Sequence, residues 1–141
     1  MIILDTCVLV EALRTDRDSA LVSWLDNQSA ETLFITATSV ADLLIGIAEM
    51  PNGKRKKQIS GALEMLLVRL FSSRILPFDQ QAAVSYSELL NSATSGKSLS
   101  FCDGQIAAIA IVHNFAIATS NTTTYQSLGL KTINPWASPI G

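Results

Sequence analysis

The sequence opens with Met1-Ile2-Ile3-Leu4-Asp5-Thr6, four apolar residues followed at once by a carboxylate and a hydroxyl. A short, wholly apolar run of this kind predicts a strand that is buried on both faces of a parallel sheet. In open parallel α/β sheets, ligands bind in the crevice outside the carboxyl ends of the strands. We therefore expect Asp5 to lie at the edge of the sheet where chemistry takes place.

Length and composition predict one globular domain. The chain has 141 residues, of which 48% are hydrophobic and 16% are charged. This composition excludes an intrinsically disordered chain and leaves apolar surface for a partner. The formal net charge is −2, so the molecule has no global positive field that would attract nucleic acid. A bound polyanion would have to be held by a local patch or by a metal ion.

The cysteines and the absence of long apolar runs favour a cytoplasmic protein. Cys7 and Cys102 lie in or beside apolar runs and have neither CxxC nor Cys/His spacing, so we expect both to be reduced and buried. No basic segment precedes the opening apolar run, which Asp5 interrupts, and we therefore expect no signal peptide. No uninterrupted apolar stretch approaches the roughly 20 residues that a membrane span needs.

Apolar runs that alternate with amphipathic patterns predict an α/β fold. Strands are expected near 1–4, 32–38, 75–78, 115–119 and 131–133. Helices are expected at about 6–14, from 18 or 19 onward, and at about 39–50, 55–71, 80–92 and from 100 onward. Because helices separate the strands, we expect right-handed crossovers and a central twisted parallel sheet of about five strands, flanked by helices.

Hydroxyl and carboxylate residues at the ends of strands are expected to cap the helices that follow. Thr6 and Ser39 are the expected caps after the first two strands, which would put Asp42 in the first turn of its helix. Asp79 follows the third strand and is also interpreted as a cap. These positions predict that several helices begin at one edge of the sheet.

The segment from Ser100 onward predicts a buried helix. Ser100 and Asp103 have the spacing of a capping box, and the residues that follow are almost all apolar. Gly104 would permit a close approach by a neighbour, and Asn114 suits the left-handed conformation that ends a helix. Beyond the last strand, 134–136 is expected to begin a loosely held tail.

Four polar residues, Asp5, Asp42, Asp103 and Asn121, would meet at one edge of the sheet if this topology holds. Each alone is explained by a helix cap or by interaction with a helix dipole. Together, converging carboxylates repel one another and raise their pKa values unless a cation intervenes. Oxygen ligands without His or Cys suit Mg²⁺ or Mn²⁺. Such an ion can orient a water and stabilise charge on a phosphodiester.

The long amphipathic helix expected over 55–71 has two features that concern partners. With the preceding helix, it has more apolar surface than one small sheet can cover, which predicts a groove for an amphipathic segment. Its N-terminal end carries the basic run 54–57, although cations there oppose the helix dipole. Two interpretations of that run stay open, a solvated surface and a patch that contacts phosphates.

Six segments spread over nearly the whole chain form an ordered set of motifs. They are Ile3-Leu4-Asp5-Thr6, Ser39-Val40-Ala41-Asp42-Leu43, Pro51-Asn52-Gly53-Lys54-Arg55, 101–110, Ala118-Thr119-Ser120-Asn121 and Ile133-Asn134-Pro135-Trp136. With these segments the chain resembles the PIN domain of VapC-type toxins, and most of all the FitB-like branch of toxin–antitoxin ribonucleases.

The resemblance implies a three-layer PIN-like α/β fold, with a single domain over 1–136 and a C-terminal tail over 137–141. It implies a metal-dependent endoribonuclease toxin of a type II toxin–antitoxin module, which hydrolyses RNA phosphodiester bonds by a metal-activated water. It also implies a homodimer, and neutralisation by a cognate antitoxin protein whose C-terminal segment fills the acidic groove. No membrane partner is expected.

Carried over by position, the resemblance implies that Asp5 and Asp103 bind Mg²⁺ or Mn²⁺ directly. Asp42, where the family typically has Glu, would hold the metal or its water or act as a base. Asn121 would orient water or phosphate, beside Thr124, where many members have a further acid. These two departures predict weaker metal affinity. The alternative is a catalytically weakened or inactive PIN-fold module that binds RNA or an antitoxin.

Overall fold

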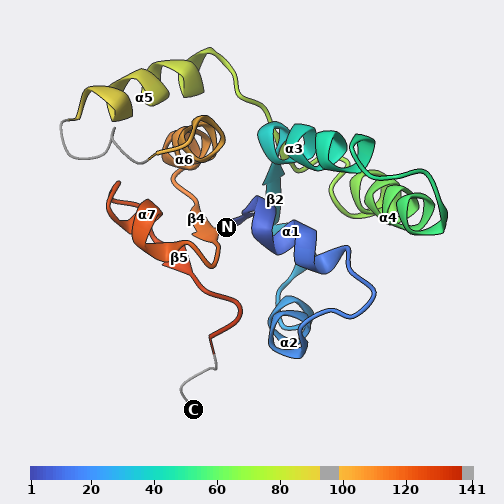
Figure 1. Ribbon diagram of the computed structural model, residues 1–141. Coiled ribbons are helices and arrows are strands. Elements are labelled where there is room, and N and C mark those ends of the chain that lie inside the picture. Colours follow the sequence, from blue (N-terminus) through green and yellow to red (C-terminus); the bar gives the residue numbers. More distant parts are fainter. Residues whose placement is uncertain (93–98, 138–141) are drawn as a thin grey trace.

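Figure 1 presents the computed structural model, which describes residues 1–92 and 99–137. The sequence predicts a loop at 95–97, and this loop and most of the expected C-terminal tail lie outside the described residues. No helix in the described part of the chain combines the length and the apolar character that crossing a membrane requires.

The described residues form one five-stranded sheet in the order β3-β2-β1-β4-β5, and all four pairings are parallel. The strands are β1 (Ile2–Leu4), β2 (Leu33–Thr36), β3 (Ile75–Leu76), β4 (Ala116–Ala118) and β5 (Thr132–Ile133). The central parallel sheet predicted from the sequence is thus confirmed. The chain leaves β1 toward β2 and β3, and later returns to the other side of β1 with β4 and β5, so the strand order reverses between β1 and β4.

Helices cover both faces of this sheet, which gives three layers (Figure 1). The helices are α1 (Thr6–Ala12), α2 (Ser19–Asp26), α3 (Ala37–Ala48), α4 (Lys54–Met65), α5 (Gln80–Asn91), α6 (Phe101–His113) and α7 (Thr122–Gln126). Two short turns complete the described elements, a 3₁₀ turn at Ala30–Thr32 and a π-helical turn at Leu66–Leu70, which ends the long amphipathic segment.

Alternating side chains of the strands build two hydrophobic cores. Leu4 of β1 and Ala118 of β4 point into a core shared with α1, α2, α3 and α4. Ile3 and Ile117 point the opposite way, into a core with α5, α6 and α7. Because β1 and β4 are buried on both faces, their residues are apolar throughout, as the opening run of the sequence predicted.

Two predicted helix caps were wrong by one to three residues. Asp5, not Thr6, caps α1 and accepts a hydrogen bond from the backbone N–H of Thr6 at 2.9 Å. Thr36, not Ser39, caps α3 and accepts from the backbone N–H of Ser39 at 3.0 Å. The β-branched run therefore changes to helix at Thr36, its second threonine, because that hydroxyl satisfies a free N–H of the first turn. Asp42 consequently lies in the second turn of α3 and not in the first.

Other local predictions are confirmed. Asp79 caps α5, Ser100 caps α6, and Asn114 ends α6 in the left-handed conformation with φ 57°. Gly104 permits a close approach, since a Cβ built there would lie 2.3 Å from Cε2 of Tyr86. The expectation of a loosely held segment at 134–136 is wrong, because Pro135 is buried and Trp136 packs against the first core. Helix α7 was not predicted.

Candidate active site

The site lies outside the carboxyl ends of β1 and β4, where the strand order reverses. This is the place at which open parallel sheets bind ligands. Asp5 follows β1 directly, and Thr119 follows β4 directly. The backbone N–H of Asp5 donates to the carbonyl oxygen of Ala118 at 3.0 Å, so the pairing of the two strands continues up to the acid.

Asp5 is buried, with 5% of its surface exposed. Its Oδ2 accepts a hydrogen bond from the hydroxyl of Thr119 at 2.7 Å. Burial raises the pKa of the Asp5 carboxyl above its ordinary value, although the hydrogen bonds from Thr119 and Thr6 work against that rise. The negative charge of Asp103 raises the pKa of Asp5 further. The environment of Asp5 therefore favours a proton or a cation close to its carboxylate.

Asp103 reaches the same place from the first turn of α6. The hydroxyl of Tyr125, in α7, donates to Oδ1 of Asp5 at 3.2 Å and lies 3.4 Å from Oδ1 of Asp103. Both carboxylates thus converge on one hydroxyl group, although 97 residues of chain separate them in the sequence. Burial strongly raises the pKa of the Tyr125 hydroxyl, so it keeps its proton at neutral pH and can act as a donor.

Asn121 is linked to Asp5 through Thr119. The backbone N–H of Asn121 donates to the Thr119 hydroxyl at 2.9 Å, and this hydroxyl in turn donates to Asp5. The side-chain oxygen of Asn121 accepts a hydrogen bond from the Thr124 hydroxyl at 3.0 Å. These contacts hold the exposed Asn121 amide at the rim of the site, with Thr124 as its neighbour.

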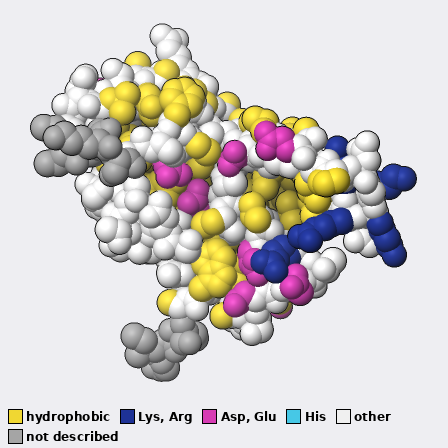
Figure 2. Space-filling view, in the orientation of Figure 1, with side chains coloured by type: hydrophobic (Ala, Val, Ile, Leu, Met, Phe, Trp, Pro, Cys, Tyr) yellow, Lys and Arg dark blue, Asp and Glu magenta, His cyan; other side chains and the backbone are white. Residues whose placement is uncertain are grey.

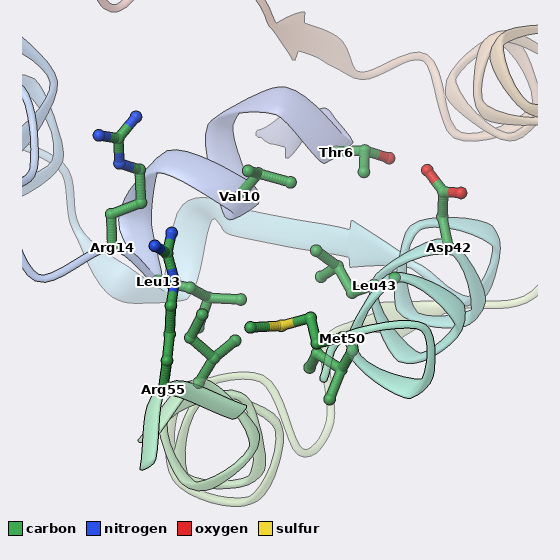
Figure 3. Close-up of a pocket in the computed structure, with 11 residues that line it drawn as sticks. Thr6, Val10, Leu13, Arg14, Asp42, Leu43, Met50 and Arg55 are labelled. Carbon is green, nitrogen blue, oxygen red and sulfur yellow. The ribbon is translucent and has the colours of Figure 1, made fainter. Parts of the chain in front are cut away.

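Asp42 lies on the opposite side of the site, exposed on α3. In Figure 3 its carboxylate faces the hydroxyl of Thr6 at one end of a pocket. Within the described residues, no three side chains of the His, Cys, Asp and Glu types form a group that could hold a metal ion. A direct bond from Asp42 to a metal therefore stays a prediction.

The two cysteines flank the acidic residues. Cys102 lies close enough to feel their charge, and burial together with Asp42, Asp103 and Asp5 raises the pKa of its thiol to about 11. The Cys7 sulfur lies 3.7 Å from the Thr119 hydroxyl. Both cysteines are free, as expected, but each is half-buried and not buried in the core. Their position beside the site was not predicted from the sequence.

The pair of Asp5 and Asp103 fits a hard divalent cation. Mg²⁺ is usually held by one or two carboxylates together with waters and substrate phosphates, so a cage of protein ligands is not needed. A cation between the two carboxylates would also relieve the repulsion that raises the pKa of Asp5. The residues that would hold it are therefore Asp5 and Asp103.

A groove runs away from the acidic residues between α1, α3 and α4. Its first part has a volume of about 420 Å³ and begins at Thr6 and Asp42. Apolar side chains line its middle, and Arg14 and Arg55 stand at its far end (Figure 3). A second hollow of about 660 Å³ shares those two arginines and continues past Arg17. Figure 2 shows the same order on the surface, with hydrophobic side chains between acidic groups and a cluster of Lys and Arg.

A family model of the PIN domain matches residues 2–126. The chain belongs to the PIN domain family. The VapC ribonuclease Y4jK of Sinorhizobium fredii is 43% identical over 137 residues, which cover 96% of this chain and 98% of that protein. Toxin FitB of Neisseria gonorrhoeae is 39% identical over 137 residues, 96% of this chain and 99% of FitB. The crystal structure of FitAcB from Neisseria gonorrhoeae has a TM-score of 0.89 at 38% identity, covering 98% of this chain and 100% of that one.

Two residues of this PIN domain site were missed in the sequence. Thr119 was recognised only as part of a motif, and its hydroxyl is the closest hydrogen-bond partner of Asp5. Nothing in the sequence indicated that Tyr125 belongs to the site, although its ring is fully buried and its hydroxyl joins the two acids. A buried tyrosine needs a partner for its hydroxyl, but the sequence cannot identify that partner until α7 is placed against β1.

Proposed function

We propose that this PIN domain is an endoribonuclease toxin of a type II toxin–antitoxin module and that it depends on Mg²⁺ or Mn²⁺. The observation that carries the proposal is the convergence of Asp5 and Asp103 on the Tyr125 hydroxyl at the carboxyl edge of the sheet. The relatives named VapC ribonuclease and toxin FitB support both the activity and the toxin assignment. The cytoplasm, where RNA is available, is the proposed place of action.

The site residues have distinct roles in this proposal. Asp5 and Asp103 hold the divalent cation, which when bound activates water and neutralises charge on the phosphodiester. Asp42, on the other side of the site, positions water or takes up its proton. Asn121 orients water or phosphate, because its contacts with Thr119 and Thr124 fix it at the rim.

The groove between α1, α3 and α4 is the proposed seat of the cognate antitoxin. It offers an apolar centre with an acidic residue at one end and two arginines at the other. This pattern suits an amphipathic segment that carries a cation near its tip. Such a segment would lie over Asp42 and close the entrance to Asp5, which would stop cleavage.

A homodimer is also part of the proposal. Large apolar side chains remain exposed on the described surface of the single chain, and several of them lie on α3 and α5. They include Leu44, Ile45, Val84 and Leu90. Exposed apolar side chains of this number favour contact with a second copy. Sedimentation equilibrium of the purified toxin tests this, and a monomer at high concentration would contradict it.

The cleavage assay uses the full chain, a single-stranded RNA and Mg²⁺. We expect Asp5→Asn and Asp103→Asn each to lower the cleavage rate about 100-fold or more, because each removes a negative ligand of the cation. Asp79→Asn is the matched control. Asp79 also follows a strand and caps a helix, but it lies outside the site, and Asn is an equally good cap. Cleavage that survives both site changes contradicts the proposal.

A non-catalytic PIN module is the second candidate. The observation that favours it is the lack of a third ligand beside the two carboxylates within the described residues. Calorimetric titration with Mn²⁺ separates the two functions. Binding heat supports the nuclease, and its absence at millimolar metal supports a module that binds RNA or antitoxin without cutting.

A further inference from the structure

We infer that Tyr125 is a positioning residue that fixes Asp5 and Asp103 in the geometry needed to share one divalent cation. The inference rests on the proposed function, because it assumes that this pair of carboxylates binds the ion. Tyr125 would not touch the cation or the RNA. It would act through the two acids, by holding them together before a cation binds.

The first support is the position of the hydroxyl. It lies 3.2 Å from Oδ1 of Asp5 and 3.4 Å from Oδ1 of Asp103. One hydroxyl group therefore lies within reach of a carboxylate oxygen of each acid, so the two carboxylates are close neighbours. Without an intervening group, two carboxylates at this separation would repel each other and turn apart. One shared donor offsets that repulsion, since its proton can be attracted by both oxygens.

The second support is the difference between the two acids. Asp5 is held independently of Tyr125, by the Thr6 N–H and by the Thr119 hydroxyl. Within the described residues, the Asp103 carboxylate accepts a hydrogen bond from Tyr125 alone. Asp103 is also partly exposed on α6, so its side chain has other rotamers available. The hydroxyl of Tyr125 is thus the group that turns Asp103 toward Asp5.

The third support is the rigidity of the tyrosine. Its side chain is fully buried and packs in the second core, together with Ile3, Ile106 and Ile117. A ring with two rotatable bonds in a closely packed core has a single orientation. The hydroxyl is therefore a fixed point to which both carboxylates are oriented. Groups that donate to metal ligands without touching the metal commonly determine the orientation of those ligands.

Tyr125→Phe isolates the hydroxyl, because phenylalanine keeps the buried ring. Mn²⁺ binding to the full-length metal-free protein is measured by calorimetry, without any RNA. We expect Tyr125→Phe to weaken Mn²⁺ binding at least about 10-fold, the lower end of the effect of removing such a hydrogen-bond partner. Tyr86→Phe is the matched control. Its ring packs on Gly104 and on two phenylalanines, and it should bind Mn²⁺ like the wild type.

The outcomes distinguish the inference from the proposed function. If the wild type and Tyr125→Phe bind Mn²⁺ equally well, Tyr125 has no positioning role and the nuclease proposal is unaffected. A lower melting temperature of Tyr125→Phe with unchanged Mn²⁺ affinity also overturns the inference, since it indicates a structural role only. If the wild type binds no Mn²⁺, the proposed function fails and the inference fails with it.

A spectroscopic measurement covers the case in which Tyr125→Phe does not fold. The chain contains two tyrosines, so the Tyr86→Phe variant retains Tyr125 alone. Its ultraviolet resonance Raman spectrum reports the hydrogen bond of that hydroxyl while Mg²⁺ is added. We expect the tyrosine bands to change and to saturate at the same Mg²⁺ concentration as the binding heat. Bands that do not respond, in a protein that binds Mg²⁺, overturn the inference.

Discussion

The hydroxyl of Thr119 donates a 2.7 Å hydrogen bond to Oδ2 of Asp5, and this contact joins the ends of the two central strands. Thr119 is fully buried. Its oxygen also accepts the backbone N–H of Asn121 at 2.9 Å, so one hydroxyl connects the start of α7 to the first acid of the site. The contact therefore contributes both to the fold and to the electrostatics of the toxin site.

Thr119→Val tests this contact. Valine has the same shape as threonine but removes the donor to Asp5 and the acceptor for Asn121, which leaves buried polar groups without partners. We expect a loss of about 1–3 kcal/mol in the free energy of unfolding. Urea denaturation at neutral pH measures it. Thr119→Ser retains the hydroxyl and should recover most of the loss, whereas a valine variant as stable as the wild type would contradict the role of the hydrogen bond.

Protonation of Asp5 should make the free energy of unfolding depend on pH. Its pKa in the folded state is raised above the ordinary value of 3.8, chiefly by burial. The folded state thus binds the proton more tightly than the unfolded chain does, and stability falls as the pH rises from about 3.8 through the raised pKa. The same denaturation series with Asp5→Asn provides the reference. We expect the stability of the wild type relative to this variant to decrease over that interval, and a difference that rises with pH would refute the prediction.

Added Mg²⁺ should reverse this loss at neutral pH. A ligand that binds only the folded state stabilises it by an amount that grows with its concentration. We expect the melting temperature of the wild type to rise with Mg²⁺ concentration, and those of Asp5→Asn and Asp103→Asn to rise much less. Differential scanning calorimetry is the measurement, with Na⁺ at matched ionic strength as the control. Equal shifts in all three proteins would indicate a general salt effect.

The sequence predicted those parts of this PIN domain in which local pattern and tertiary structure agree. The apolar run before Asp5 indicated a buried strand, because four residues are enough for a strand but too few for a helix. The segment after Ser100 combined a cap, a glycine and continuous apolar residues, all of which are typical of a buried helix. Placing both acids at one edge then followed from the parallel topology, and the structure brings them together.

What the sequence left undetermined depends on choices between similar local interactions. Thr36 and Ser39 are both good helix caps, and only the geometry of the strand end determines that Thr36 is used. Helix α7 has five residues, three of them threonines, which are weak helix formers. Trp136 is held by packing against a distant core. The sequence could not indicate a role for Tyr125, because its partners Asp5 and Asp103 belong to other parts of the fold.

Gly104→Ala should destabilise the fold through Tyr86. A Cβ at this position would lie 2.3 Å from Cε2 of the tyrosine ring, so α5 or α6 must shift to accommodate it. We expect a cost of about 1–3 kcal/mol, typical of overpacking a closely packed core. Gly61→Ala is the control, because nothing lies within 4 Å of its Cβ position in α4. There alanine should stabilise the helix by up to about 1 kcal/mol.

The structure divides the basic run at the start of α4 into a lysine with a structural contact and lysines that are exposed. Lys56 lies 3.4 Å from the carbonyl oxygen of Ala48 and from Oδ1 of Asn52, which gives it a structural contact at the end of α3. Lys54 and Lys57 are exposed at the same end of α4 and make no such contact within the described residues. Only these outer lysines are suitable for a test of phosphate contact that leaves the fold unchanged.

The double variant Lys54→Gln, Lys57→Gln should bind single-stranded RNA more weakly if the run contacts phosphates. The logarithm of the affinity falls as the logarithm of the salt concentration rises. Each phosphate contact that is lost makes this slope less steep by about 0.7 for single strands. Fluorescence anisotropy in the absence of divalent metal measures binding without cleavage. Lys131→Gln is the matched control. Lys131 precedes β5, so it lies at the edge of the sheet where the parallel strands begin, opposite the edge that carries the site. If the double variant has the same salt slope as the wild type and the control, the run is a solvated surface and does not contact phosphates.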